Sequence, residues 1–121
     1  MTGSYDRGMA VRREVLGDDH VDRAPADAFS APFQEFITKT AWGEVWARDG
    51  LDRRSRSMIT LALLAGLGRS EELALHVRAA LRNGLTEAEI GEVLLHTAVY
   101  AGVPAANSAF AVARRVLAGD E

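Results

Sequence analysis

A glutamate and a histidine four residues apart in the middle of the chain could together transfer a proton. Glu72 and His76 fall in a stretch with helical spacing of apolar residues, so their side chains project from one face, a turn apart. A carboxylate beside an imidazole can orient the ring and favour its protonated form, as a proton donor near neutral pH requires. The alternative is a half-exposed helical ion pair contributing about 0.3–0.5 kcal/mol. Spacing alone favours the ion pair.

His96 and Tyr100 repeat this spacing in a more apolar stretch. Burying an imidazole and a phenol there without hydrogen-bond partners would cost roughly 1–3 kcal/mol. Two interpretations therefore stay open. Either the two side chains satisfy each other and the nearby backbone within the core, or they line a cavity.

Arginines are the candidate anion-binding residues, because Lys39 is the only lysine in the chain. Arg56 lies near the start of a predicted helix, and Arg78 lies among the turns that carry Glu72 and His76. A guanidinium matches a planar carboxylate, although arginines more often cover solvated faces.

A metal site is an alternative to these proton-transfer roles. His76, His96 and Glu72 could supply a two-histidine, one-carboxylate set if the fold brought them together. The sequence has no local motif of a helical zinc site, and we expect no metal.

The elements that must position these residues are helices, because apolar spacing is helical almost throughout and no window alternates like a strand. We expect an all-α domain of about six helices. The first spans residues 5–16 and is followed by a polar connector at 18–25. A second helical region runs from about residue 27 towards 46, continuous or broken. The last four helices are expected to begin at an Asp52 cap, a Ser70 cap, a Thr86/Glu89 capping box and Pro104.

Length and composition limit the class of protein. A chain of 121 residues with 48% hydrophobic and 26% charged residues is expected to form one domain, residues 1–121, in which residues 1–7 are a candidate disordered segment. The absence of cysteine excludes disulfides and thiolate chemistry.

A net charge of −3 and short apolar runs give no reason to expect nucleic-acid or membrane binding. The first residues lack the apolar core of a signal peptide, so we expect a cytoplasmic protein.

Two predicted helices are too apolar for a solitary monomer. Residues 58–67 are hydrophobic on nearly every side, and so are residues 93–103 apart from three polar positions. Helices without a polar stripe are normally enclosed by neighbours, so we expect a homo-oligomer.

Five stretches together resemble a known family. They are GMAVRREVLGDDHV (8–21), TAWGEVW (40–46), LDRRSRSMIT (51–60), LHVRAA (75–80) and EIGEVLLHTAVYAGVPAAN (89–107). On these motifs the chain resembles the carboxymuconolactone decarboxylase family, within the alkylhydroperoxidase D-like superfamily. The resemblance covers nearly the whole chain. It implies an all-helical domain assembled as a hexamer, a trimer of dimers.

The chain departs from the redox members of that superfamily. Their Cys-x-x-Cys-x-x-x-His motif aligns with Arg69, Glu72 and His76, and their relay glutamate aligns with Ser57. Without either sulfur the chain cannot run a dithiol cycle. Both substitutions favour decarboxylation over redox chemistry.

The resemblance implies conversion of 4-carboxymuconolactone to 3-oxoadipate enol-lactone and CO₂ in protocatechuate catabolism (the β-ketoadipate pathway). No cofactor is expected, because the unsaturated lactone can accept the electrons of the breaking bond itself. His76, oriented by Glu72, would donate the proton, and His96 or Tyr100 would donate a hydrogen bond to the dienolate oxygen. The residues expected to bind the dicarboxylate lactone are Arg56, Arg78, Arg23, His20 and Trp42.

Two other functions remain as alternatives. One is an isomerase or dehalogenase acting on a related muconolactone with the same fold. The other is a non-catalytic helical oligomerisation module, in which the histidines and Tyr100 would surround no pocket.

Overall fold

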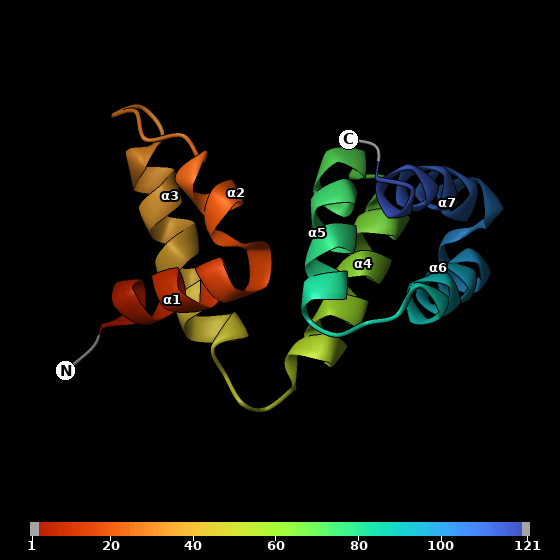
Figure 1. The fold of residues 1–121 in the computed structure, drawn as a ribbon, viewed down its shortest axis with the longest axis horizontal. Helices are drawn as coiled ribbons and strands as arrows, with labels where there is room; N and C mark the ends of the chain where they lie inside the picture. Colours follow the sequence, from red (N-terminus) through yellow and green to blue (C-terminus); the bar gives the residue numbers. More distant parts are fainter. Residues whose placement is uncertain (1–2, 120–121) are drawn as a thin grey trace. The chain divides into compact units, whose positions relative to one another are not determined.

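The computed structural model describes residues 3–119, which form helices and connecting turns without a strand (Figure 1). The predicted all-α class is confirmed. The chain divides into an N-terminal unit that ends at Asp52 and a C-terminal unit that begins at Arg53. The single domain predicted from chain length stays a prediction. The candidate disordered segment falls partly on residues 1 and 2, which lie outside the described range, while residues 4–7 form the first turn of a helix.

The N-terminal unit is built on the contact between its first helix and its last. Its elements are α1 (Ser4–Leu16), α2 (Asp18–Asp22), α3 (Ala31–Ile37) and the π-helix η1 (Thr38–Trp46). A Cβ atom added to Gly8 of α1 would lie 1.9 Å from the carbonyl oxygen of Thr38, and one added to Gly43 of η1 would lie 2.2 Å from that of Ser4. Only glycine permits this approach of the two backbones.

Polar contacts hold the same helices together. The buried guanidinium of Arg12 donates hydrogen bonds to the Thr38 hydroxyl at 3.2 Å and to the Gln34 side-chain oxygen at 3.1 Å. Arg12 thus connects α1 with both α3 and η1. Buried polar groups joined in this way fix the register between helices better than apolar contacts alone.

Two segments of this unit differ from the sequence prediction. Part of the expected polar connector forms the short helix α2, whose Asp18 and Asp22 accept hydrogen bonds from Arg13 at 3.0 and 2.9 Å. The second helical region begins at Ala31 and not near residue 27, because residues 27–30 form a bend and turns. From Ala31 to Trp46 it is continuous, but it changes from α to π geometry at Thr38. The amide of Ala47 bonds to the carbonyl of Trp42, five residues back. Apolar spacing predicts a helix but does not distinguish these two hydrogen-bonding patterns.

The C-terminal unit contains four longer helices around an apolar core. They are α4 (Arg53–Leu67), α5 (Ser70–Arg82), α6 (Glu87–Ala101) and α7 (Val103–Leu117). Each helix contributes fully or nearly fully buried side chains to one cluster: Leu61, Ala65, Leu73, Val77, Ala80, Leu85, Ile90, Leu94, Ala109, Val112 and Ala113. This core fixes the faces of α5 and α6 that carry the candidate functional residues.

Of the predicted starts of α5, α6 and α7, that of α6 is correct and the other two differ by one residue. The Thr86/Glu89 capping box is confirmed: the Glu89 amide donates to the Thr86 hydroxyl at 3.1 Å, and the Thr86 amide donates to the Glu89 carboxylate at 2.9 Å. The Ser70 cap is wrong by one residue, because the helical bonds of α5 already begin at the carbonyl of Arg69. Pro104 is the second residue of α7 and not its first.

Many large apolar side chains are exposed. In the C-terminal unit they include Ile59, Leu63 and Leu67 on α4, and Leu95, Val99 and Val103 on α6 and at the start of α7. In the N-terminal unit Phe29, Phe33 and Phe36 are exposed although they follow helical spacing. The described residues of the C-terminal unit therefore leave part of the apolar surface of α6 uncovered.

Candidate functional site

Helix α5 places Glu72 and His76 on one face, as the four-residue spacing predicts. The Nε2 atom of His76 lies 4.0 Å from a carboxylate oxygen of Glu72, which is an ion-pair distance and too long for a hydrogen bond. The His76 side chain is 10% exposed and that of Glu72 is 63% exposed. A carboxylate at the surface thus lies beside an imidazole that is embedded in the core-facing side of the helix.

Helix α6 carries His96 and Tyr100 with their rings in contact. The ring centroids are 5.2 Å apart and the ring planes are inclined by 30°. Both residues are exposed, Tyr100 at 81%, so the interpretation of this pair as buried core is wrong. The apolar spacing around them belongs to the uncovered surface of α6.

His96 also lines a hollow of about 440 Å³ between α4 and α6. The other lining residues are Met58, Ile59 and Ala62 of α4, and Glu89, Glu92 and Val93 of α6. The hollow therefore combines four apolar side chains with two carboxylates and one imidazole. This is the arrangement of a small-molecule site, a mostly apolar surface with a few polar groups at defined places.

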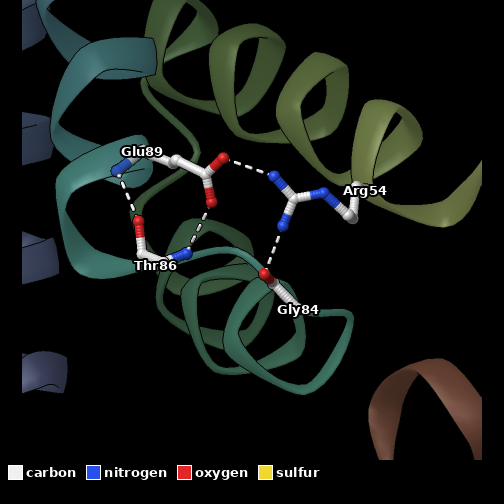
Figure 2. A network of polar contacts seen from close by, with 4 residues as sticks. All are labelled: Arg54, Gly84, Thr86 and Glu89. Carbon is white, nitrogen blue, oxygen red and sulfur yellow. Dashed lines mark hydrogen bonds and ion pairs between the residues drawn. The ribbon is translucent and has the colours of Figure 1, made fainter.

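One of the two carboxylates in the hollow is held by a polar network (Figure 2). Arg54 of α4 donates hydrogen bonds both to the Glu89 carboxylate and to the carbonyl oxygen of Gly84. The hydrogen bond from Arg54, with a smaller contribution from the backbone amide of Thr86, lowers the pKa of Glu89 below its ordinary value. Glu89 stays ionised, and the charge of Arg54 offsets it.

Sequence reasoning named His96 but missed the other six residues of this hollow. Glu89 was identified only as part of a helix cap. Glu92 could have been found by the same criterion as Glu72, because it precedes His96 by four residues. Met58, Ile59, Ala62 and Val93 gave no separate signal, since an apolar residue on an apolar helix looks the same whether it faces a core or a hollow.

The candidate arginines of the C-terminal unit do not share one hollow. Arg56 is half-buried on α4, one helical turn before Ile59, and is not itself among the residues that line the His96 hollow. Arg78 is exposed and lines a different hollow of about 310 Å³, together with Arg115 of α7 and Ser70, Glu71 and Ala74 of α5.

The remaining candidates lie in the N-terminal unit. His20 is half-buried in α2, and Arg23 is exposed just after it. Trp42 is only 6% exposed, and its ring lies 5.1 Å from that of Trp46, centroid to centroid. Trp42 therefore packs as a core residue of η1.

Two further features of the described residues bear on the class of protein. No group of three or more His, Asp or Glu side chains within residues 3–119 is placed to hold a metal ion, so His76, His96 and Glu72 do not form the ligand set considered above. In the same range, no helix is both long and apolar enough to span a membrane.

With this helical fold and site, the chain belongs to the carboxymuconolactone decarboxylase family, whose model matches residues 31–115. It is 48% identical over 114 residues to a 4-carboxymuconolactone decarboxylase of Acinetobacter baylyi, a match that covers 93% of this chain and 85% of that protein. It is 47% identical over 115 residues to the nitrosuccinic acid decarboxylase npaB of Metarhizium robertsii, covering 93% and 80%. A 42-residue match to a 4-carboxymuconolactone decarboxylase of Pseudomonas putida is 55% identical but covers only 33% of this chain.

Proposed function

We propose that the protein is a cofactor-independent carboxy-lyase that converts 4-carboxymuconolactone to 3-oxoadipate enol-lactone and CO₂. The observation that carries this proposal is the 48% identity over 93% of the chain to a decarboxylase named for that substrate. The absence of cysteine supports it as well, because the dithiol chemistry of related helical proteins is impossible here.

The substrate makes a cofactor unnecessary. Its departing carboxylate is attached to the γ-carbon of an α,β-unsaturated lactone. When that carbon–carbon bond breaks, CO₂ leaves and the bonding electrons move through the double bond to the lactone carbonyl oxygen, giving a dienolate. One proton delivered to the α-carbon completes the enol-lactone. The protein must therefore bind two carboxylates, stabilise an oxyanion and supply one proton.

The proton and the hydrogen bond to the oxyanion can come from side chains of the C-terminal unit. We assign proton donation to His76, beside Glu72, and hydrogen bonding to the dienolate oxygen to His96 or Tyr100. His96 is supported by its place in the hollow, where a bound substrate would displace water from four apolar side chains and so strengthen a hydrogen bond to a developing charge. The residues assigned to the substrate carboxylates are Arg56 and Arg78, with Arg23 and His20, and Arg56 is favoured among them because it lies one helical turn from Ile59. Trp42 is assigned to substrate binding on the sequence resemblance alone, since this residue is 6% exposed.

Nitrosuccinate is a second candidate substrate, because the relative from Metarhizium robertsii is nearly as similar. In this compound the departing carboxylate is attached to the carbon that bears the nitro group. The electrons of the breaking bond can pass to the nitro oxygens as a nitronate, and one carboxylate remains. Both compounds are thus dicarboxylates with their own electron acceptor, and they differ in shape: one is a ring and the other an open chain.

The purified protein should be assayed with both compounds by release of CO₂ and by loss of ultraviolet absorbance of the lactone. Our proposal predicts CO₂ release from the lactone, with a higher kcat/KM than for nitrosuccinate. The opposite ratio would assign the protein to the second substrate. Conversion of a muconolactone without release of CO₂ would indicate an isomerase or dehalogenase. If the protein turns over none of these compounds, the remaining interpretation is a non-catalytic helical oligomerisation module.

We further propose that the working form is a homo-oligomer, a hexamer arranged as a trimer of dimers, in the cytoplasm. The exposed apolar side chains of α4 and α6 support association, because single soluble chains rarely leave so many uncovered. The cytoplasmic location is proposed because the catabolic reaction takes place there. Light scattering after size exclusion tests the hexamer, and cell fractionation tests the cytoplasmic location.

A further inference from the structure

His96 has two polar or aromatic neighbours on α6, one a helical turn before it and one a turn after it. Glu92 precedes it by four residues and lines the same hollow, whereas Tyr100 follows it by four residues and is not among the lining residues. Side chains on a helix lean towards its N-terminus. The imidazole would therefore be expected to approach Glu92, whose carboxylate could accept a hydrogen bond from it.

The structure shows the other contact. Within the described residues, no hydrogen bond or ion pair joins His96 to Glu92, and the imidazole instead lies against the ring of Tyr100 at 5.2 Å. Tyr100 is 81% exposed and is not among the residues that line the hollow between α4 and α6. The part of Tyr100 that touches the functional group is its aromatic face.

We propose that Tyr100 is a positioning residue whose ring holds the His96 imidazole away from Glu92 and keeps its N–H group available to a ligand in the hollow between α4 and α6. For its effect on turnover this inference rests on the proposed function. It separates the two candidates for the hydrogen bond to the dienolate: His96 donates it, and Tyr100 acts through His96.

The physical reason is competition for one donor. An imidazole N–H that already bonds to a carboxylate has to break that bond before it can serve an oxyanion, whereas a donor held in place beforehand pays no such cost at the moment of reaction. The second carboxylate of the hollow, Glu89, does not compete in this way because Arg54 holds it.

Four variants test this arrangement by steady-state kinetics: Tyr100→Phe, Tyr100→Leu, Glu92→Ala, and the double variant that combines Tyr100→Leu with Glu92→Ala. Phenylalanine keeps the ring, so Tyr100→Phe should retain at least about half of kcat. Tyr100→Leu should lower kcat roughly tenfold to a hundredfold, the scale of a misplaced catalytic group, with a smaller change in KM. Adding Glu92→Ala to Tyr100→Leu should restore most of that loss, because alanine has no side-chain acceptor to compete for the imidazole N–H.

Two kinetic outcomes would overturn the proposal. If Tyr100→Phe is as impaired as Tyr100→Leu, the hydroxyl matters and not the ring. If the double variant is no faster than Tyr100→Leu, Glu92 is not the competitor.

A second measurement does not depend on turnover. In NMR spectra the ring protons of His96 should shift in Tyr100→Leu, because the ring current of the tyrosine is lost. A ring nitrogen should also show a hydrogen bond that disappears when Glu92→Ala is added, because alanine has no side-chain acceptor. Tyr5→Leu removes the other tyrosine of the chain, in α1, and should leave the His96 signals unchanged. If the protein turns over neither candidate substrate, the proposed function fails, and these spectra still decide whether Tyr100 positions His96. Unchanged His96 signals in Tyr100→Leu would refute the proposal that Tyr100 positions His96.

Discussion

Arg54, in the first turn of α4, is hydrogen-bonded to Glu89, in the first turn of α6, so that one ion pair joins the starts of two helices (Figure 2). Glu89 also closes the capping box of α6 with Thr86, and Arg54 also binds the carbonyl of Gly84 in the turn before it. The helices joined here are the two walls of the His96 hollow. The capping box predicted at the start of α6 therefore belongs to the network that holds α6 against α4, and these two helices form the hollow.

Glu89→Gln should make the stability of the protein less dependent on pH. The pKa of Glu89 is lowered in the folded protein, chiefly by Arg54. The unfolded chain therefore binds more protons in acid, so the stabilisation is fully present above the ordinary glutamate pKa of 4.5 and is lost as pH falls through the lower folded value. Urea unfolding from pH 7 down to about pH 3 should show wild type losing more free energy of unfolding than Glu89→Gln.

Glu87→Gln is the matched control for this experiment. Glu87 lies in the same first turn of α6 and interacts similarly with the helix dipole, but it has no ion pair within residues 3–119. Equal acid sensitivity of the two variants would show that the dipole, and not Arg54, determines the effect of Glu89.

Gly8→Ala should disrupt the N-terminal unit. The added methyl group would lie 1.9 Å from the carbonyl oxygen of Thr38 and 2.8 Å from the amide nitrogen of Gly43, and neither backbone atom can move without separating α1 from η1. We expect the free energy of unfolding to fall by at least about 1–3 kcal/mol.

Gly91→Ala in α6 is the control, because nothing lies within 4 Å of its added Cβ and alanine should stabilise the helix by roughly 0.5–1 kcal/mol. Thermal unfolding that ranks Gly8→Ala as the more stable variant would contradict this account.

Features of the fold that depend on local sequence were predictable, and those that depend on distant contacts were not. The Thr86/Glu89 box was predicted because its two hydrogen bonds join residues three apart. The π geometry of η1 was not, because nothing in its own apolar spacing distinguishes it from an α-helix. The close approach of Gly8 and Gly43 joins residues 35 positions apart, and neither glycine shows this on its own.

The residues of the candidate site also differ in how far the sequence could predict them. Spacing of four predicted that Glu72 shares a helix face with His76, and His96 with Tyr100. It did not predict that the His96 ring lies against Tyr100 and not against Glu92. It could not show that Arg78 shares a hollow with Arg115, 37 residues away on α7, or that Met58 and Val93 face a common hollow. Those relations depend on how helices pack.

Val99→Glu should weaken the association of subunits. Val99 is 75% exposed on α6, next to the exposed side chains of Leu95 and Val103 at helical spacing, and a carboxylate placed there would have to be desolvated in any contact that covers them. Size-exclusion light scattering should show smaller particles than wild type at equal concentration. Arg114→Glu introduces the same charge at an exposed position of α7 outside this apolar surface and should leave the mass unchanged. An unaltered mass for Val99→Glu would place the subunit contact elsewhere.

His76→Gln should lower kcat much more than Glu72→Gln. The His76 side chain is nearly buried, so a substrate that reaches it meets a desolvated donor, and loss of a general acid costs typically 10²–10⁴-fold. The Glu72 carboxylate lies 4.0 Å away and is 63% exposed, so solvent screens its attraction and its removal should cost less than about tenfold. Circular dichroism should show both variants folded. If His76→Gln keeps near-normal turnover while His96→Gln loses it, the proton donor is His96, and the four-residue pair on α5 is an ordinary helical ion pair.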